Sequence, residues 1–154
     1  MLNDLRMNAA LRERALRLLA RREHARAELA RKLAVYAETE EELVALLDDL
    51  AARRLLSDER YVEMRLNARS ARYGNSRLAQ ELRATGVDDE LVKHGLAATE
   101  DEVLRASEVW KRKFGCVGVP TDAAGRARQM NFLLRRGFSG ETIRRVLRGG
   151  SEDD

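Results

Sequence analysis

The sequence FLLRRGFSGETIRRVL (residues 132–147) decides the fold, because the same pattern occurs earlier in the chain as ELRATGVDDELVKHGL (residues 81–96). In both stretches a leucine stands four residues before a glycine, a hydrophobic residue follows the glycine, and a leucine ends the stretch. A more divergent copy, KLAVYAETEEELVALL (residues 32–47), has Ala37 in place of the glycine. The chain is therefore predicted to contain three repeats of about fifty residues each.

The composition predicts that these repeats are helical. The 154 residues include one proline and are 44% hydrophobic, and Ala, Leu, Arg and Glu dominate while β-branched residues are few. We expect an all-α protein of three tandem three-helix repeats, about nine helices, stacked into an elongated and curved array of either hand. The predicted repeats are residues 1–56 with an N-terminal extension, residues 57–109, and residues 110–154 with an acidic tail.

Several residues mark the expected helix ends. Thr39 with Glu42 forms a capping box, and Ser57 followed by two acidic residues begins another helix. Gly86 and Gly137 are predicted to be left-handed residues that end helices, each followed by a hydrophobic residue that packs against the helix it terminates. The glycine-containing loop FGCVGVPTD (residues 114–122) is taken as the separator between the second and third repeats.

The sequence offers no constellation of catalytic residues. His24 and His94 are isolated, and we expect each to be a satisfied surface or boundary side chain. Cys116 is the single cysteine and has no neighbouring base, so it is expected to be an inert thiol. The carboxylate clusters at the helix starts fit a helix-dipole role. We therefore expect no enzyme, no metal site and no cofactor.

The same survey sets expectations for location. A single cysteine cannot form an internal disulfide, so an oxidising compartment is not required. No apolar run approaches the roughly 20 residues that span a bilayer, and the N-terminus lacks the layout of a signal peptide. We expect a cytoplasmic protein that makes no membrane contact.

Charge is segregated along the chain although the net charge is only +3. Residues 1–36, 61–86 and 110–150 are basic, and residues 37–60 and 87–109 are acidic. Arginine outnumbers lysine by 25 to 4, which favours recognition of phosphate or carboxylate groups. The alternatives are a solvated helix surface and enrichment of arginine by a GC-rich genome. The candidate basic surface comprises Arg21, Arg22, Arg26, Arg31, Lys32, Arg69, Arg72, Arg77, Arg126, Arg128, Arg135, Arg136, Arg144, Arg145 and Arg148.

Three stretches together resemble the RecX family of bacterial regulators of the RecA recombinase: ALRLLARREHARAELARKL (residues 15–33), residues 55–92 and NFLLRRGFSGETIRRVL (residues 131–147). The resemblance implies three tandem three-helix repeats and a cytoplasmic, non-enzymatic protein that binds RecA–DNA filaments. It also implies that the protein restrains filament growth, ATP hydrolysis, strand exchange and co-protease activity. Ala25 departs from the family pattern, which implies a helix-capping serine at this position.

Two functional hypotheses remain open. The favoured one is a filament regulator, expected to be a monomer, whose basic residues form a track along the RecA filament. The alternative is a helix-turn-helix-like DNA-binding protein, and an auxiliary contact to single- or double-stranded DNA is compatible with either hypothesis. A sequence-specific reader needs a recognition helix and usually a dimerisation element, and no repeat shows both.

Overall fold

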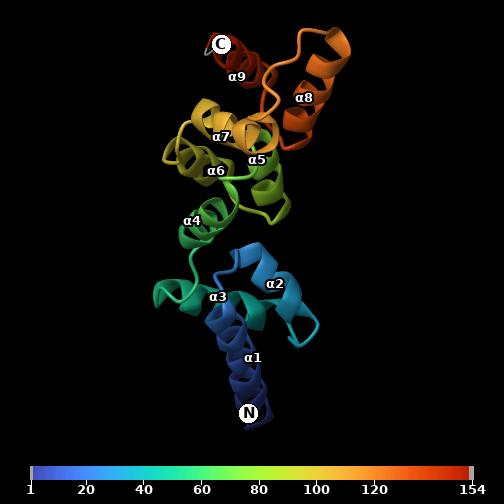
Figure 1. Cartoon of the computed structure of the whole chain (residues 1–154). Coiled ribbons are helices and arrows are strands. Elements are labelled where there is room, and N and C mark those ends of the chain that lie inside the picture. The colour runs from blue at the N-terminus through green and yellow to red at the C-terminus, as the bar shows by residue number, and fades with distance from the viewer. Residues whose placement is uncertain (1, 153–154) are drawn as a thin grey trace. The chain divides into compact units, whose positions relative to one another are not determined.

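The computed structural model describes residues 2–152, and within this range the chain forms nine α-helices and no strand (Figure 1). The helices are α1 (Leu2–Arg21), α2 (Arg26–Ala34), α3 (Glu40–Ala52), α4 (Asp58–Arg69), α5 (Asn75–Ala84), α6 (Asp89–Ala97), α7 (Glu102–Phe114), α8 (Ala123–Arg135) and α9 (Gly140–Glu152). The all-α class and the number of helices predicted from the sequence are confirmed. None of these helices is long and apolar enough to cross a membrane.

The contacts divide the chain into two compact units. One unit holds the residues up to Met64 together with Leu82–Val92, and the other holds Arg65–Glu81 together with the residues from Lys93 onward. The units therefore do not follow the boundaries of the repeats. α4, α5 and α6 each contribute residues to both units.

Each unit has its own apolar core, and the core of the first unit is rich in leucine. In the first unit, α1, α2 and α3 bury apolar side chains against one another: Leu11, Ala15, Leu29, Leu33, Leu43, Leu46, Leu47 and Leu50. In the second unit, α7 packs against α8 and α9 through Ala106, Val109, Trp110, Leu133, Phe138, Ile143, Val146 and Leu147. The spacing of these residues follows the helical period, so each helix presents one apolar face to its core.

Two glycines end helices as predicted. Gly86 has φ +82° and Gly137 has φ +89°, and residues with a Cβ rarely adopt this region. At Gly137, the N–H of Phe138 donates to Leu133 O at 3.2 Å and the N–H of Gly137 donates to Leu134 O at 2.9 Å. These two bonds form the Schellman arrangement, and the side chain of Phe138 is buried behind it.

The predicted helix starts are also confirmed. Thr39 Oγ1 accepts from the N–H of Glu42 at 3.1 Å, and Ser57 Oγ accepts from the N–H of Arg60 at 3.2 Å. The side chain of Glu42 reaches back as in a capping box, but it accepts from the N–H of Glu38, the residue before the N-cap, rather than from that of Thr39. Ala25 occupies the N-cap position of α2 without a side-chain hydrogen bond.

The start of the third repeat differs from the sequence interpretation. Trp110, the first residue of the third repeat as divided from the sequence, lies inside α7. The loop that follows α7 joins it to α8, and α7 contacts both α8 and α9. The boundary between the second and third repeats was predicted near the glycine-containing loop because this loop is the clearest break in this part of the sequence.

Candidate functional site

Contacts within the fold account for the position of His24, which the sequence offered as a candidate for catalysis. His24 is buried, with Nδ1 3.0 Å from Arg22 O and Nε2 3.1 Å from Lys32 Nζ. Burial lowers the pKa of His24, so the ring is neutral, its Nδ1–H donates to the carbonyl and its Nε2 accepts from the ammonium group. His24 is satisfied as expected, but it lies in the interior rather than at the surface. Cys116 is exposed.

The described residues contain no group of three or more His, Cys, Asp or Glu side chains placed to hold a metal ion. Of the three acidic clusters in the sequence, Glu40–Glu42 lies in the first turn of α3 and Glu100–Glu102 lies at the start of α7, where the carboxylates face the positive ends of the helix dipoles, whereas Asp48 and Asp49 lie further along α3. The positions of the two clusters at helix starts fit the helix-dipole role expected from the sequence.

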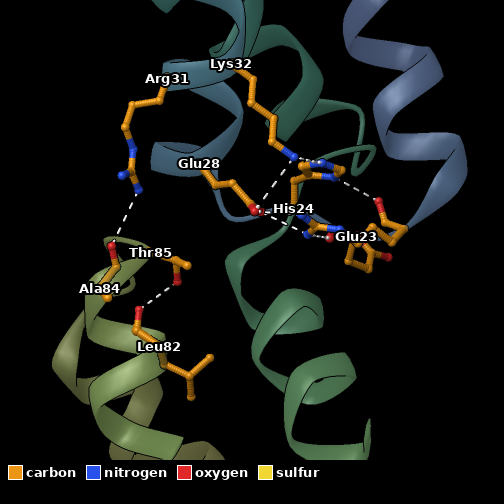
Figure 2. A network of polar contacts seen from close by, with 9 residues as sticks. Glu23, His24, Glu28, Arg31, Lys32, Leu82, Ala84 and Thr85 are labelled. Carbon is orange, nitrogen blue, oxygen red and sulfur yellow. Dashed lines mark hydrogen bonds and ion pairs between the residues drawn. The ribbon is translucent and has the colours of Figure 1, made fainter.

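The basic residues of the first repeat are largely engaged within the protein (Figure 2). Arg22 donates to both carboxylate oxygens of Glu28 at 3.0 and 2.7 Å, and Lys32 Nζ lies 3.9 Å from the same carboxylate. Burial raises the pKa of Glu28, but the hydrogen bond from Arg22 and the positive charges around it outweigh burial, so the net pKa is lowered. Glu28 therefore stays ionised and neutralises part of the basic cluster.

Both arginines of α2 also have partners within the protein. The side chain of Arg26 donates to Asp48 at 2.6 Å. Arg31 reaches the carbonyl oxygen of Ala84 at 3.5 Å, close to the end of α5 (Figure 2). The first repeat thus offers fewer available cations than its sequence suggests.

In the second repeat, one carboxylate gathers three arginines. Glu81 accepts from Arg69 at 2.7 and 2.8 Å and from Arg77 at 3.4 Å, and Arg65 lies 3.6 Å away. Burial raises the pKa of Glu81, but the bond from Arg69 and the neighbouring positive charges lower it overall. In return, the hydrogen bond to Glu81 raises the pKa of Arg69. The guanidinium groups of these arginines are therefore paired with the carboxylate of Glu81.

The third repeat differs from the other two because several of its arginine side chains have no described partner. Among the described contacts, the side chains of Arg126, Arg128, Arg135 and Arg144 have no ion pair and no hydrogen bond, and all four are exposed. Arg145 has only a long pair with Glu141 at 3.6 Å, in which both side chains are exposed. Such a pair contributes little to stability, about 0–1 kcal/mol. The available positive charge is therefore concentrated on α8 and α9.

Helical geometry divides these cations between two sides of α8. Arg128 and Arg135 are seven residues apart, so they lie on the same face. Arg126 points about 160° away from Arg128, since each residue advances the helix by about 100°. The three residues do not form one stripe, and the available surface contains the pair Arg128 and Arg135.

Sequence reasoning missed a buried arginine. Arg105 of α7 donates to the carbonyl oxygens of Ser70 at 3.0 Å, Tyr73 at 2.9 Å and Glu100 at 2.8 Å, and also to the side chain of Asn75. Burial lowers the pKa of Arg105, although nearby acidic groups oppose this shift. The available signal was its position four residues before Val109, on the apolar face of α7.

The second half of the chain matches known domains. Residues 57–96 match the family model for the second three-helix domain of RecX, and residues 100–147 match that for the third. α4, α5 and all but the last residue of α6 lie within the first match, and α7 and α8 lie within the second together with most of α9.

Similarity to curated proteins extends over nearly the whole chain. The chain is 47% identical over 150 residues to regulatory protein RecX of Herminiimonas arsenicoxydans, covering 97% of this chain and 98% of that protein. It is 45% identical over 145 residues to regulatory protein RecX of Chromobacterium violaceum, covering 94% and 93%. A crystal structure of RecX from Lactobacillus salivarius has a TM-score of 0.84 at 18% identity, covering 96% of this chain and 99% of that one, which shows a shared fold.

Proposed function

The chain belongs to the RecX family, and from this premise we propose that it is a negative regulator of the RecA recombinase. In this role it binds RecA–DNA filaments and restrains their growth, ATP hydrolysis, strand exchange and co-protease activity. Recombinational repair and the SOS response are modulated as a consequence. The protein acts in the cytoplasm by binding and performs no chemistry of its own.

The observation that carries this proposal is the match to regulatory proteins over nearly the full length of the chain. The available charge adds support. Arg128, Arg135 and Arg144 are exposed on α8 and α9 and have no acidic partner among the described residues. Cations of this kind accelerate encounter with a negatively charged assembly and fix orientation through electrostatic complementarity. We place the filament contact on this part of the third repeat.

The experiment that tests the function measures ATP hydrolysis by RecA on single-stranded DNA while this protein is added below the RecA concentration. A binder that blocks filament extension affects more subunits than it touches, so hydrolysis falls by more than the fraction of RecA bound. Unchanged hydrolysis at excess protein, under conditions in which filaments form, would contradict the proposal. The alternative function, helix-turn-helix-like DNA binding, requires comparable binding to duplex DNA without RecA and a preference among sequences.

A further inference from the structure

A basic pocket lies in the second unit, beside the C-terminal ends of α7 and α8. Its volume is about 390 Å³, within the usual range for small-molecule sites. Four cationic side chains, Arg72, Arg112, Lys113 and Arg136, line it together with the rings of Tyr73 and Phe132. None of the residues that line it is acidic, so its positive charge is not compensated from within.

The aromatic rings contact two of these cations. The guanidinium of Arg136 lies 5.3 Å from the ring centroid of Tyr73 and 5.2 Å from that of Phe132. Lys113 Nζ lies 5.5 Å from the ring of Phe132. Cation–π contacts of this kind favour a defined position of the charge, so the pocket is partly organised before an anion arrives.

The internal repeat indicates what such a cluster binds. Phe132 is the first residue of the third copy of the repeated stretch, and Glu81 is the first residue of the second copy. At Glu81 the protein places a carboxylate that accepts from Arg69 of the preceding helix. At Phe132 the acid is replaced by a ring, which contacts Lys113 of the preceding helix and borders an open pocket. The third repeat therefore lacks the internal anion at this position, and the cations beside its ring come from the end of α7, from the residue after α8 and from the segment between α4 and α5.

We propose that this pocket binds the phosphate group of a nucleotide, which supplies the anion that the lining of the pocket lacks. A phosphate presents several acceptor oxygens, and guanidinium groups bind such oxygens in a fork. The face of an arginine or an aromatic ring is also a platform on which a base stacks, so the lining of the pocket suits a whole nucleotide rather than a bare carboxylate. The nucleotide belongs to a single strand or is free, and the same pocket chemistry serves both.

This inference does not depend on RecA binding, because the pocket is defined by its own lining residues. A negative result in the RecA assay would not contradict nucleotide binding, and a negative result in the nucleotide-binding assay would not contradict the proposed function. Its test accordingly contains no RecA. The purified full chain is titrated against a fluorescein-labelled oligothymidylate at low salt, and binding is followed by fluorescence anisotropy.

The principal variant is the double substitution Arg112→Ala with Lys113→Ala. We expect it to weaken oligothymidylate binding by about tenfold or more, because charge-assisted hydrogen bonds to phosphate are lost. The dependence of binding on salt should also become shallower by about 0.7 per phosphate contact removed. The matched control is Arg17→Ala with Arg83→Ala, which removes the same charge from exposed positions outside the pocket. Equal weakening in the control would overturn the proposal.

A second variant uses the internal repeat directly. Phe132→Glu places an acid where the second repeat has Glu81, so the pocket cations gain an internal partner and the oligonucleotide should lose affinity. Phe132→Leu removes the ring without adding charge and should retain more binding than Phe132→Glu. A circular dichroism melt of each variant checks that the edge-to-face contact of Phe132 with Phe114 is not essential for folding.

Competition identifies the source of the nucleotide. Displacement of the labelled strand by ATP supports a site for free nucleotides, whereas displacement only by unlabelled oligothymidylate supports a strand-binding site. Either pattern of displacement confirms the phosphate site, provided that the Arg112→Ala, Lys113→Ala variant no longer binds the labelled strand. Displacement by polyglutamate as effective as that by oligothymidylate would contradict it, because the pocket would then bind acidic peptides.

Discussion

The carboxylate of Asp58 accepts a 2.7 Å hydrogen bond from the backbone N–H of Arg26, the first residue of α2. Asp58 is itself the first residue of α4, so one side chain serves the starts of two helices. Ala25, in the N-cap position of α2, has no side-chain oxygen to offer. The start of α2 is therefore capped by a carboxylate that lies thirty-two residues after Arg26 in the chain.

The first prediction follows from this relationship. Asp58→Ala should lower the free energy of unfolding by about 0.5–2 kcal/mol, the usual cost of losing a helix cap. Ala25→Ser in the same background should restore part of this loss by supplying a local cap. Chemical denaturation followed by circular dichroism measures both changes.

Asp48→Ala is the matched control for Asp58→Ala, because Asp48 binds the side chain of Arg26 rather than its backbone. Both partners of that surface pair are exposed, so its loss should cost less than about 1 kcal/mol. If Asp48→Ala and Asp58→Ala cost the same, the capping role of Asp58 is wrong.

The second prediction concerns Gly137. A Cβ built on Gly137 would lie 2.3 Å from Arg77 Cβ, and its φ of +89° is unfavourable for any residue with a side chain. Gly137→Ala should therefore destabilise the protein by about 1 kcal/mol or more. Gly149→Ala, where the new Cβ meets no atom within 4 Å, should be neutral or stabilising because alanine favours the helix. Thermal melts showing the same sign for both variants would contradict this account.

The third prediction concerns Arg105, which donates hydrogen bonds to three backbone carbonyl oxygens. Arg105→Met should cost about 3 kcal/mol or more, because these acceptors then lack a donor. Arg126→Met, at an exposed position without a described partner, should change stability by less than about 0.5 kcal/mol. Denaturant midpoints compare the two, and a small effect at Arg105 would show that water replaces the guanidinium.

The features that the sequence predicts correctly are local ones. Gly86 and Gly137 were identifiable because a Schellman stop is formed by residues within one turn of each other, and Thr39 because its cap lies three residues ahead. Arg26 shows where such reasoning ends. Its backbone partner Asp58 and its side-chain partner Asp48 are thirty-two and twenty-two residues away, and no period in the sequence encodes either contact.

The part of the candidate basic surface that remains unpaired could not be predicted from the sequence either. Counts of charge identified arginine-rich segments, but they could not show that Glu81 holds Arg69 and Arg77 while Arg128 has no ion pair among the described contacts. Pairing depends on which helix faces which, and this is decided by tertiary packing. Sequence patterns therefore predicted the repeat and its helices, whereas the available part of the basic surface required the structure.

The fourth prediction concerns pH. Burial holds the pKa of His24 below its usual value of 6.5, so the unfolded chain takes up a proton at higher pH than the folded chain does. Stability should therefore fall as pH drops below about 6.5, by up to about 1.4 kcal/mol per pH unit for one such group. Glu28 and Glu81 have lowered pKa values, so their contribution is lost only at lower pH, as pH falls below about 4.5.

His24→Gln should flatten the dependence of stability on pH between about pH 7 and pH 5.5, because no buried imidazole remains to be protonated. His94→Gln, at an exposed position, is the control and should keep the slope of the parent. Denaturation curves at several pH values decide the question. A parent whose stability is constant over this range would show that His24 is protonated without cost.

The last prediction tests where the protein meets the RecA filament. Arg128 and Arg135 lie on one face of α8, are exposed and have no described acidic partner, so reversing both to Glu converts attraction into repulsion without breaking an internal pair. We expect the double variant to bind RecA–DNA filaments at least about tenfold more weakly at low salt, with helicity unchanged. Its residual binding should depend less on salt, since screening acts on the charges that were removed. The control is Arg17→Glu with Arg83→Glu, which makes the same change in net charge at exposed positions paired with Glu13 and Asp89. If both double variants lose affinity equally in a co-sedimentation assay, the effect belongs to net charge and the face of Arg128 and Arg135 is a solvated surface.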